Sequence, residues 1–198
     1  MARGTSSVDT SRMRSDVIEN RQRILEAATD VLAGDPNASM QEIADAAALN
    51  RGTLYRHFPN REQLVVAIHA AAVANMRELY LSLPKSGPVL PSLIELVGPA
   101  VEVASRYRVL ILAPIADPSR LVAEAQSMEV LAAAVHRAQR AGEVDRRISP
   151  IVAATTFGSQ ILAAATLIAR GGVAPADAIA QTRLVLRKAL TAAPETND

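Results

Sequence analysis

The chain has 198 residues, 49% of them hydrophobic and only 3% aromatic, and it carries a formal net charge of +1 at pH 7. The absence of cysteine excludes a disulfide framework and any thiolate metal site. The near-neutral charge means that any contact with nucleic acid must come from a local surface. Ala, Leu, Val and Ile dominate the apolar residues, and no segment alternates between apolar and polar residues as a strand does, so we expect an all-α fold. We also expect no cofactor.

The N-terminus is expected to be a disordered arm over residues 1–14. This segment lacks the apolar core of a signal peptide, which suits a cytoplasmic protein. The first helix is then expected to begin with a cap at Ser15 or Asp16. It should end at Gly34, because Pro36 blocks its continuation.

Two short helices are predicted next, each opened by a capping residue. Ser39 and Glu42 have the spacing of a capping box, which predicts a helix that ends by about Ala47. Asn50 is the expected cap of the following helix, and Pro59 ends it.

A longer helix should follow from a cap at Asn60, and its apolar period continues until Pro84. The segment from Pro84 to Pro88 is the clearest internal boundary of the chain. Further helical patterns extend from there to about Ala192. In total we expect about nine helices and no sheet.

One helical pattern is apolar enough to raise the question of a membrane span. The 22 residues from Ile148 to Ala169 contain no charged side chain. Several polar residues interrupt the segment, and no Trp or Tyr marks its edges. A helix buried within protein explains it better, and we expect no membrane partner.

The two short helices have the layout of a helix-turn-helix over residues 39–58, whose second helix enters the major groove of DNA. Leu54 and Phe58 lie four residues apart and should face inward, which leaves the other side of this helix outward. No acidic residue occurs from Asn50 to Arg61. Tyr55 could instead pack on its own domain, and the basic residues could form a solvated surface. The candidate DNA-binding residues are Ser39, Met40, Gln41, Asn50, Arg51, Gly52, Thr53, Tyr55, Arg56, His57, Asn60 and Arg61.

These segments resemble the TetR family of regulators. The matching strings are EIA at residues 42–44, RGTLYRHF at 51–58 and PNREQL at 59–64, with ILEAA at 24–28 upstream. The resemblance covers about residues 17–80, and the string GTLYRHF is its most specific part. Beyond residue 80 only the helical layout and the length agree.

The resemblance implies roles for individual residues. Arg51, Gly52 and Thr53 would meet base edges and backbone, and Tyr55 a phosphate or a thymine. Arg56 and His57 would face the groove, Arg61 would bind a phosphate, and Met40 and Gln41 would lie within reach of DNA. The family commonly has Gly where this chain has Ala48, so the turn should adopt another conformation or carry mild strain.

The resemblance also implies an effector pocket and a homodimer in the C-terminal region. Polar or aromatic residues on apolar helices are the candidates for the pocket, namely Glu102, Tyr107, Met128, His136, Phe157 and Gln160. Few aromatic residues and no acidic cluster point to an apolar effector rather than a metal. Small and apolar residues of the last two helices are the candidates for the dimer interface, namely Ala154, Gly158, Ile161, Leu162, Ile179, Leu186 and Leu190. They could instead fill only the core of one protomer.

The sequence therefore predicts a DNA-binding domain over residues 15–83, an effector-binding and dimerisation domain over 84–192, and a disordered tail over 193–198. The expected function is a ligand-responsive transcriptional regulator, a repressor that binds a palindromic operator of double-stranded DNA as a homodimer and is released by a small apolar effector. An all-helical enzyme is the main alternative, but the chain has no HExxH, GxSxG or Walker motif. A helical adaptor whose helix-turn-helix binds protein is the second.

Overall fold

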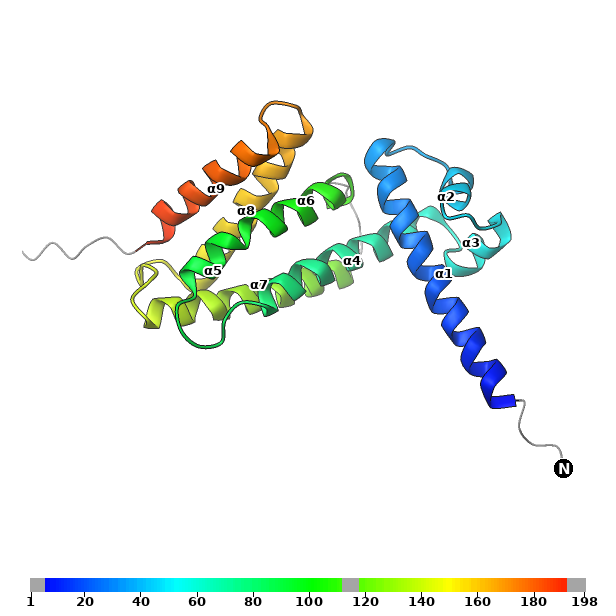
Figure 1. Ribbon diagram of the computed structural model, residues 1–198, viewed down its shortest axis with the longest axis horizontal. Coiled ribbons are helices and arrows are strands. Elements are labelled where there is room, and N and C mark those ends of the chain that lie inside the picture. Colours follow the sequence, from blue (N-terminus) through cyan, green and yellow to red (C-terminus); the bar gives the residue numbers. More distant parts are fainter. Residues whose placement is uncertain (1–5, 112–117, 192–198) are drawn as a thin grey trace, which may run out of the picture. The chain divides into compact units, whose positions relative to one another are not determined.

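The computed structural model describes residues 6–111 and 118–191, which contain nine helices (Figure 1). Within these residues there is no strand, and one isolated antiparallel bridge joins Val144 to Thr191. The prediction of an all-α fold is confirmed. The chain divides into two compact units, one up to Ile68 and the other from His69 onward.

The first helix, α1 (Ser6–Gly34), begins earlier than the predicted cap at Ser15 or Asp16. The segment ahead of that cap was expected to be a disordered arm, but no Gly or Pro occurs in it after residue 5, so nothing stops the helix from extending. Ile24, Ala28 and Leu32 recur at helical spacing along α1 and are fully buried. Val17, nearer the start of the same helix, is 54% exposed.

Three capping predictions are confirmed. Ser39 and Glu42 form the capping box of α2 (Met40–Ala46). The side chain of Asn50 accepts from the backbone N–H of Thr53 at 2.8 Å and opens α3 (Arg51–His57). The side chain of Asn60 accepts from the backbone N–H of Gln63 at 2.9 Å and opens α4 (Arg61–Leu81).

The turn between α2 and α3 has the hydrogen bonds of a Schellman motif. The N–H of Leu49 donates to the carbonyl of Ala44, and the N–H of Ala48 donates to that of Asp45, both at 3.0 Å. This motif requires a left-handed residue after the helix, and Ala48 has φ of 53°. Of the two possibilities for Ala48, the turn therefore keeps the usual conformation and carries the strain of a Cβ atom, about 1 kcal/mol.

The second unit contains the later part of α4 together with five further helices. These are α5 (Leu90–Glu95), α6 (Val97–Ile111), α7 (Pro118–Arg140), α8 (Pro150–Ala169) and α9 (Pro175–Leu190). Helix α8 packs against α6, α7 and α9, and Phe157 at its middle is fully buried. The ring of Phe157 meets that of Tyr80 edge-on, with centroids 6.4 Å apart. This core therefore joins α8 to α4.

The division between the units falls inside α4, whereas the sequence analysis placed its domain boundary at Pro84. Leu64 and Ile68 are buried within the first unit, and Tyr80 belongs to the core of the second. One continuous helix thus contributes to both. The domain ranges 15–83 and 84–192 remain predictions, and the predicted tail lies outside the described residues.

Helices α4 and α8 are each long and apolar enough to cross a membrane, by length and composition alone. A core helix of a soluble protein passes the same test. Helix α8 packs against three neighbouring helices, which accounts for the apolar residues on its buried side.

Replacing Ala48 with Gly should stabilise the protein. Glycine adopts a positive φ without the steric cost of a Cβ atom, although it gains freedom in the unfolded chain, so we expect a net gain of about 0.5–1 kcal/mol. Urea unfolding of the full chain measures this change. The matched control is Ala46→Gly inside α2, which should destabilise the protein by about 1 kcal/mol. An equal decrease in the free energy of unfolding in both variants would contradict the strain at Ala48.

Candidate functional site

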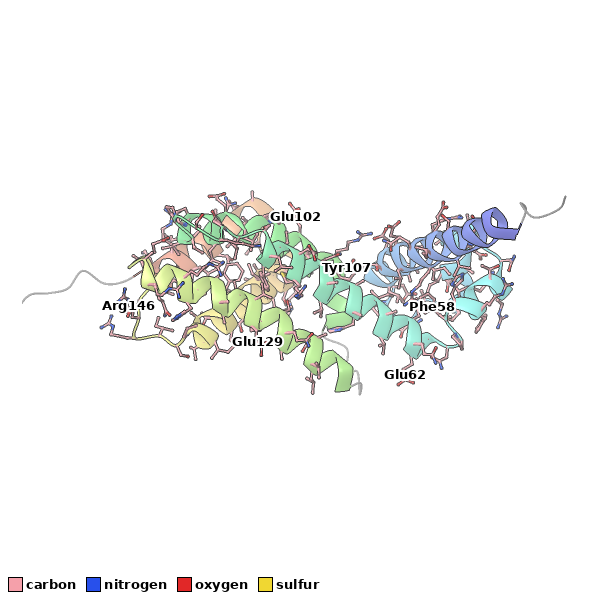
Figure 2. All side chains as sticks on the ribbon, turned by 90° about the horizontal axis from the view of Figure 1, so that it is seen from below. Phe58, Glu62, Glu102, Tyr107, Glu129 and Arg146 are labelled. Carbon is pink, nitrogen blue, oxygen red and sulfur yellow. The ribbon has the colours of Figure 1, made fainter. Side chains whose placement is uncertain are left out.

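Helix α3 turns one side into the first unit and the other side outward. Leu54 is fully buried and Phe58 is 2% exposed, and Figure 2 places Phe58 within the first unit. Arg51 is exposed, and its guanidinium carbon lies 5.1 Å from the centroid of the half-buried Tyr55 ring. Arg51 Nη2 also makes a long, 3.5 Å hydrogen bond to Tyr55 Oη. Each side chain thus limits the rotamers of the other while both remain accessible.

The beginning of α2 already holds an anion of the protein itself. The Glu42 carboxylate accepts from the backbone N–H of Ser39 at 2.6 Å and from its hydroxyl at 2.7 Å. These hydrogen bonds hold the pKa of Glu42 below its usual value, so the carboxylate stays charged. A DNA phosphate at the α2 N-terminus would meet this negative charge. Gln41 Nε2 is also engaged, since it donates to Asp45 Oδ1 at 2.8 Å, and Met40 is half-buried.

Gly52 is exposed at the beginning of α3. A Cβ atom placed on it would lie 3.4 Å from Asn50 Oδ1, the oxygen that caps the helix, which is an ordinary van der Waals contact. The fold of the first unit therefore does not by itself require glycine at this position. Thr53 is half-buried, and Asn50 and Asn60 are exposed.

Arg61 is placed differently from the role that the resemblance implies. Its guanidinium donates to the backbone carbonyls of Pro36 and Ala38, in the connection between α1 and α2. These partners lie more than twenty positions away in the sequence, so local patterns did not reveal them. In this structure Arg61 ties the first turn of α4 to the residues just ahead of α2.

Arg21 is a basic residue near the end of α3 that the sequence analysis missed. It joins two predicted residues there, the exposed Arg56 and the half-buried His57. Arg21 of α1 places its guanidinium carbon 4.6 Å from the centroid of the Phe58 ring. The pKa of His57 is lowered, first by burial and then by the positive charges of Arg21 and Arg56. Arg21 precedes the conspicuous apolar positions of α1, and no periodicity connects it with α3.

The second unit contains a cavity with about 640 Å³ of free space, part of it open to solvent. It lies between α4, α6 and α7 and is mostly apolar. Its lining consists of His69, Ala72, Val73, Met76, Tyr80, Val103, Glu124, Ser127 and Met128. The main polar feature is a contact of 3.0 Å between Nε2 of the buried His69 and Oε1 of Glu124. Burial raises the pKa of Tyr80, so its hydroxyl stays protonated.

Of the six predicted effector-pocket residues, only Met128 lines this cavity. Glu102 (Figure 2) and His136 are exposed on the surface of the second unit. Tyr107 is buried, and its hydroxyl accepts from Asn75 Nδ2 at 3.0 Å. Phe157 lies in the core.

Gln160, the sixth, borders a separate surface hollow along α8 together with Val152 and Thr155. Polarity on an apolar helix marks a residue as unusual but does not show which way it points, because that depends on the neighbouring helices.

The predicted dimer residues lie mostly inside their own unit. Four of them are buried in the core of the second unit, namely Ala154, Ile161, Leu186 and Leu190. Gly158 is half-buried, and a Cβ atom there would lie 3.5 Å from Met128 Cε. Leu162 and Ile179 are half-buried.

A different set of apolar residues on the same two helices is exposed, namely Ile151, Val152, Leu167, Leu184 and Val185. Apolar residues occur on both sides of α8, so their spacing in the sequence did not show which side faces the core. The described residues contain no group of three or more His, Asp or Glu that could hold a metal ion.

The helix-turn-helix region matches known proteins in sequence. Residues 24–68 match the family model described as bacterial regulatory proteins, tetR family. Over 54 residues the chain is 48% identical to an HTH-type transcriptional regulator of Staphylococcus aureus, covering 26% of this chain and 29% of that protein. Over 71 residues it is 39% identical to the HTH-type transcriptional repressor LfrR of Mycolicibacterium smegmatis, covering 35% of this chain and 37% of LfrR. These matches span about a third of each relative's length.

Solved structures resemble the chain over most of its length. The TetR-like transcriptional regulator LfrR from Mycobacterium smegmatis, in complex with proflavine, matches with a TM-score of 0.72 at 24% identity, over 88% of this chain and 97% of LfrR. A TetR-family regulator from a Rhodococcus species matches with a TM-score of 0.71 at 18% identity, over 88% of this chain and 100% of the other. At these identities the likeness concerns the fold alone. Residues 24–68 therefore form a helix-turn-helix region of the tetR family of bacterial regulatory proteins, and the chain shares its fold with solved TetR-like regulators.

Proposed function

We propose that the protein is a ligand-responsive repressor that binds a palindromic operator as a homodimer and releases it when a small, largely apolar effector binds. The observation that carries this proposal is the outward side of α3. Arg51, Tyr55 and Arg56 lie there on a helix anchored by buried residues, and no acidic residue interrupts the segment from Asn50 to Arg61. A short, rigid, basic helix after a tight turn suits the major groove.

The stacked pair of Arg51 and Tyr55 supports base reading near the start of α3. An arginine whose guanidinium already rests against an aromatic ring loses less freedom when it binds. Its planar donors match the O6 and N7 acceptors of guanine. The Tyr55 hydroxyl can then contact the DNA backbone or a thymine next to that guanine.

The outer side of α8 and α9 supports the homodimer. Val152, Leu167 and Leu184 are each about half exposed, although they are as apolar as the core. Thr155, Ser159 and other small residues lie between the apolar ones on α8 and allow a second helix to come close. A palindromic operator requires a protein dimer with twofold symmetry, and an apolar surface that can pair with its own copy would supply one.

The cavity of the second unit supports the effector. It is apolar, with a small number of polar groups, which is the usual character of a site for an organic ligand. Five of its residues belong to α4, the helix that begins in the DNA-binding unit. A ligand that favours one position of α4 can therefore change DNA affinity. The name of LfrR is that of a repressor, and its structure holds proflavine, which makes proflavine a reasonable first probe.

Selection of duplexes from a random pool by the full-length protein tests DNA recognition. We expect enrichment of an inverted repeat. Arg51→Ala and Tyr55→Ala should each weaken binding to that repeat by about tenfold or more, since a good base contact is worth about 1–3 kcal/mol. Arg170→Ala, which removes an exposed arginine at the end of α8, is the control and should bind as the wild type does. A pool without any enriched sequence at low salt would count against the proposal and favour an adaptor or an enzyme.

Leu184→Glu tests the homodimer. Leu184 is 53% exposed, so the change should leave the protomer folded, but a carboxylate buried in a dimer interface is costly. Sedimentation velocity should show a dimer for the wild type and a dissociation constant raised by about a hundredfold or more in the variant. Val122→Glu, at a 57% exposed apolar position of α7, is the matched control. Dissociation by both variants, or by neither, would refute an interface on α9.

Val73→Trp tests the effector cavity. Val73 lines it from α4, and an indole there should fill much of its volume. We expect proflavine binding, followed by fluorescence, to weaken by about tenfold or more, which corresponds to about 1.4 kcal/mol. Ala74→Trp, at the exposed neighbouring position, should bind as the wild type does. If saturating proflavine leaves operator affinity unchanged, proflavine is not an effector of this protein.

A further inference from the structure

Arg21 covers an aromatic ring that ends the recognition helix. Its guanidinium carbon lies 4.6 Å from the centroid of the Phe58 ring, within the range of a cation–π contact. Phe58 is 2% exposed, whereas Arg21 itself is exposed. The inner side of the guanidinium therefore rests on the ring while its outer side and edges meet solvent.

Two more basic side chains lie close to Arg21. Arg56 and His57 form the last turn of α3. Burial lowers the pKa of His57, and the positive charges of Arg21 and Arg56 lower it further. Arg21 of α1 therefore joins Arg56 and His57 of α3 at the C-terminal end of the recognition helix.

Among the described side chains, those of residues 15–107 and 121–191, no carboxylate forms an ion pair with Arg21. The carbonyl end of α3 carries some partial negative charge, but the helix has only seven residues, and Arg56 and His57 already lie at that end. Like charges held together on a surface are stabilised when an anion binds between them.

The geometry of a stacked guanidinium suits a phosphate oxygen. The ring occupies one flat side of the group, and the N–H donors point outward in its plane, where an oxygen can accept one or two of them. Because the stacking already restricts the side chain, binding costs less conformational entropy than it does for a free arginine.

We propose that Arg21, together with His57, binds a phosphate of the DNA backbone at the edge of the recognition helix. The inference rests on the proposed function, because DNA is the anion that α3 would meet. Contacts to phosphate carry no sequence information, so Arg21 sets the position of α3 along the backbone while Arg51 and Tyr55 face the bases. Arg21 is thus a positioning residue contributed by α1.

The salt dependence of operator binding tests this site. With the full-length protein and the enriched duplex, fluorescence anisotropy over a series of KCl concentrations gives the slope of log K against log salt. Arg21→Gln should lower the magnitude of this slope by about one, the value for one lost phosphate contact. Arg21→Lys should restore it, because the charge returns without the planar group. Arg77→Gln, at an exposed position of α4 in the second unit, is the control and should leave the slope unchanged.

A structural role for Arg21 would give a different result. If Arg21 only shields Phe58, Arg21→Gln lowers the melting temperature and leaves the slope at the wild-type value, which overturns the phosphate site. A slope that Arg21→Lys fails to restore overturns it as well. A wild-type protein that enriches no duplex overturns the proposed function itself, so the two failures are distinguishable.

Discussion

The candidate DNA-binding surface depends on the burial of Leu54 and Phe58. Helix α3 has seven residues, and a helix of that length is unstable in water by itself. Burial of each of these side chains contributes about 1.5–3 kcal/mol, and the Asn50 cap adds about 1 kcal/mol. The outward residues of α3 have fixed directions only because these inward residues hold the helix. Loss of either anchor would disorganise the surface without touching one of its exposed side chains.

Some arginines of the first unit donate hydrogen bonds to its own backbone, whereas others point outward from α3. Their charge is the same, so the sequence alone does not distinguish the two groups. Arg23 donates to the carbonyl of Ala47 at 2.8 Å, and Arg61 donates to the connection ahead of α2. Both hold the helix-turn-helix together from the helices on either side of it. Arg51 and Arg56 instead point outward. The two groups differ in whether a backbone carbonyl lies within reach, which is a property of the fold.

Features that depend on near neighbours in the chain could be predicted from the sequence. The capping box at Ser39, the caps at Asn50 and Asn60, and the inward pair on α3 each involve residues three or four positions apart. For Ala48 the comparison with the family's usual Gly left two conformations open, and the structure selects the left-handed one.

Features that depend on distant segments could not be predicted in the same way. The contacts of Arg61 and Arg21 join residues from different helices, and the cavity requires α4, α6 and α7 at once. For this reason only Met128 was found among the cavity residues, and two of the residues of α8 predicted for the dimer interface, Ala154 and Ile161, lie in the core of their own unit.

Helix α4 offers a physical route from the cavity to the DNA-binding surface. His69 and Met76 line the cavity, while Arg61 at the start of the same helix holds Ala38, the residue before the α2 cap. A shift of α4 along its axis would therefore pull on the beginning of α2, because a helix transmits such a movement along its length. Coupling of this kind is typically worth about 1–3 kcal/mol, or a change in affinity of about 5–150-fold. If the proposed effector releases the proposed operator, reciprocity requires that operator DNA weaken effector binding by the same factor. A compound that binds the free and the DNA-bound protein equally well cannot be the effector, however tightly it fills the cavity.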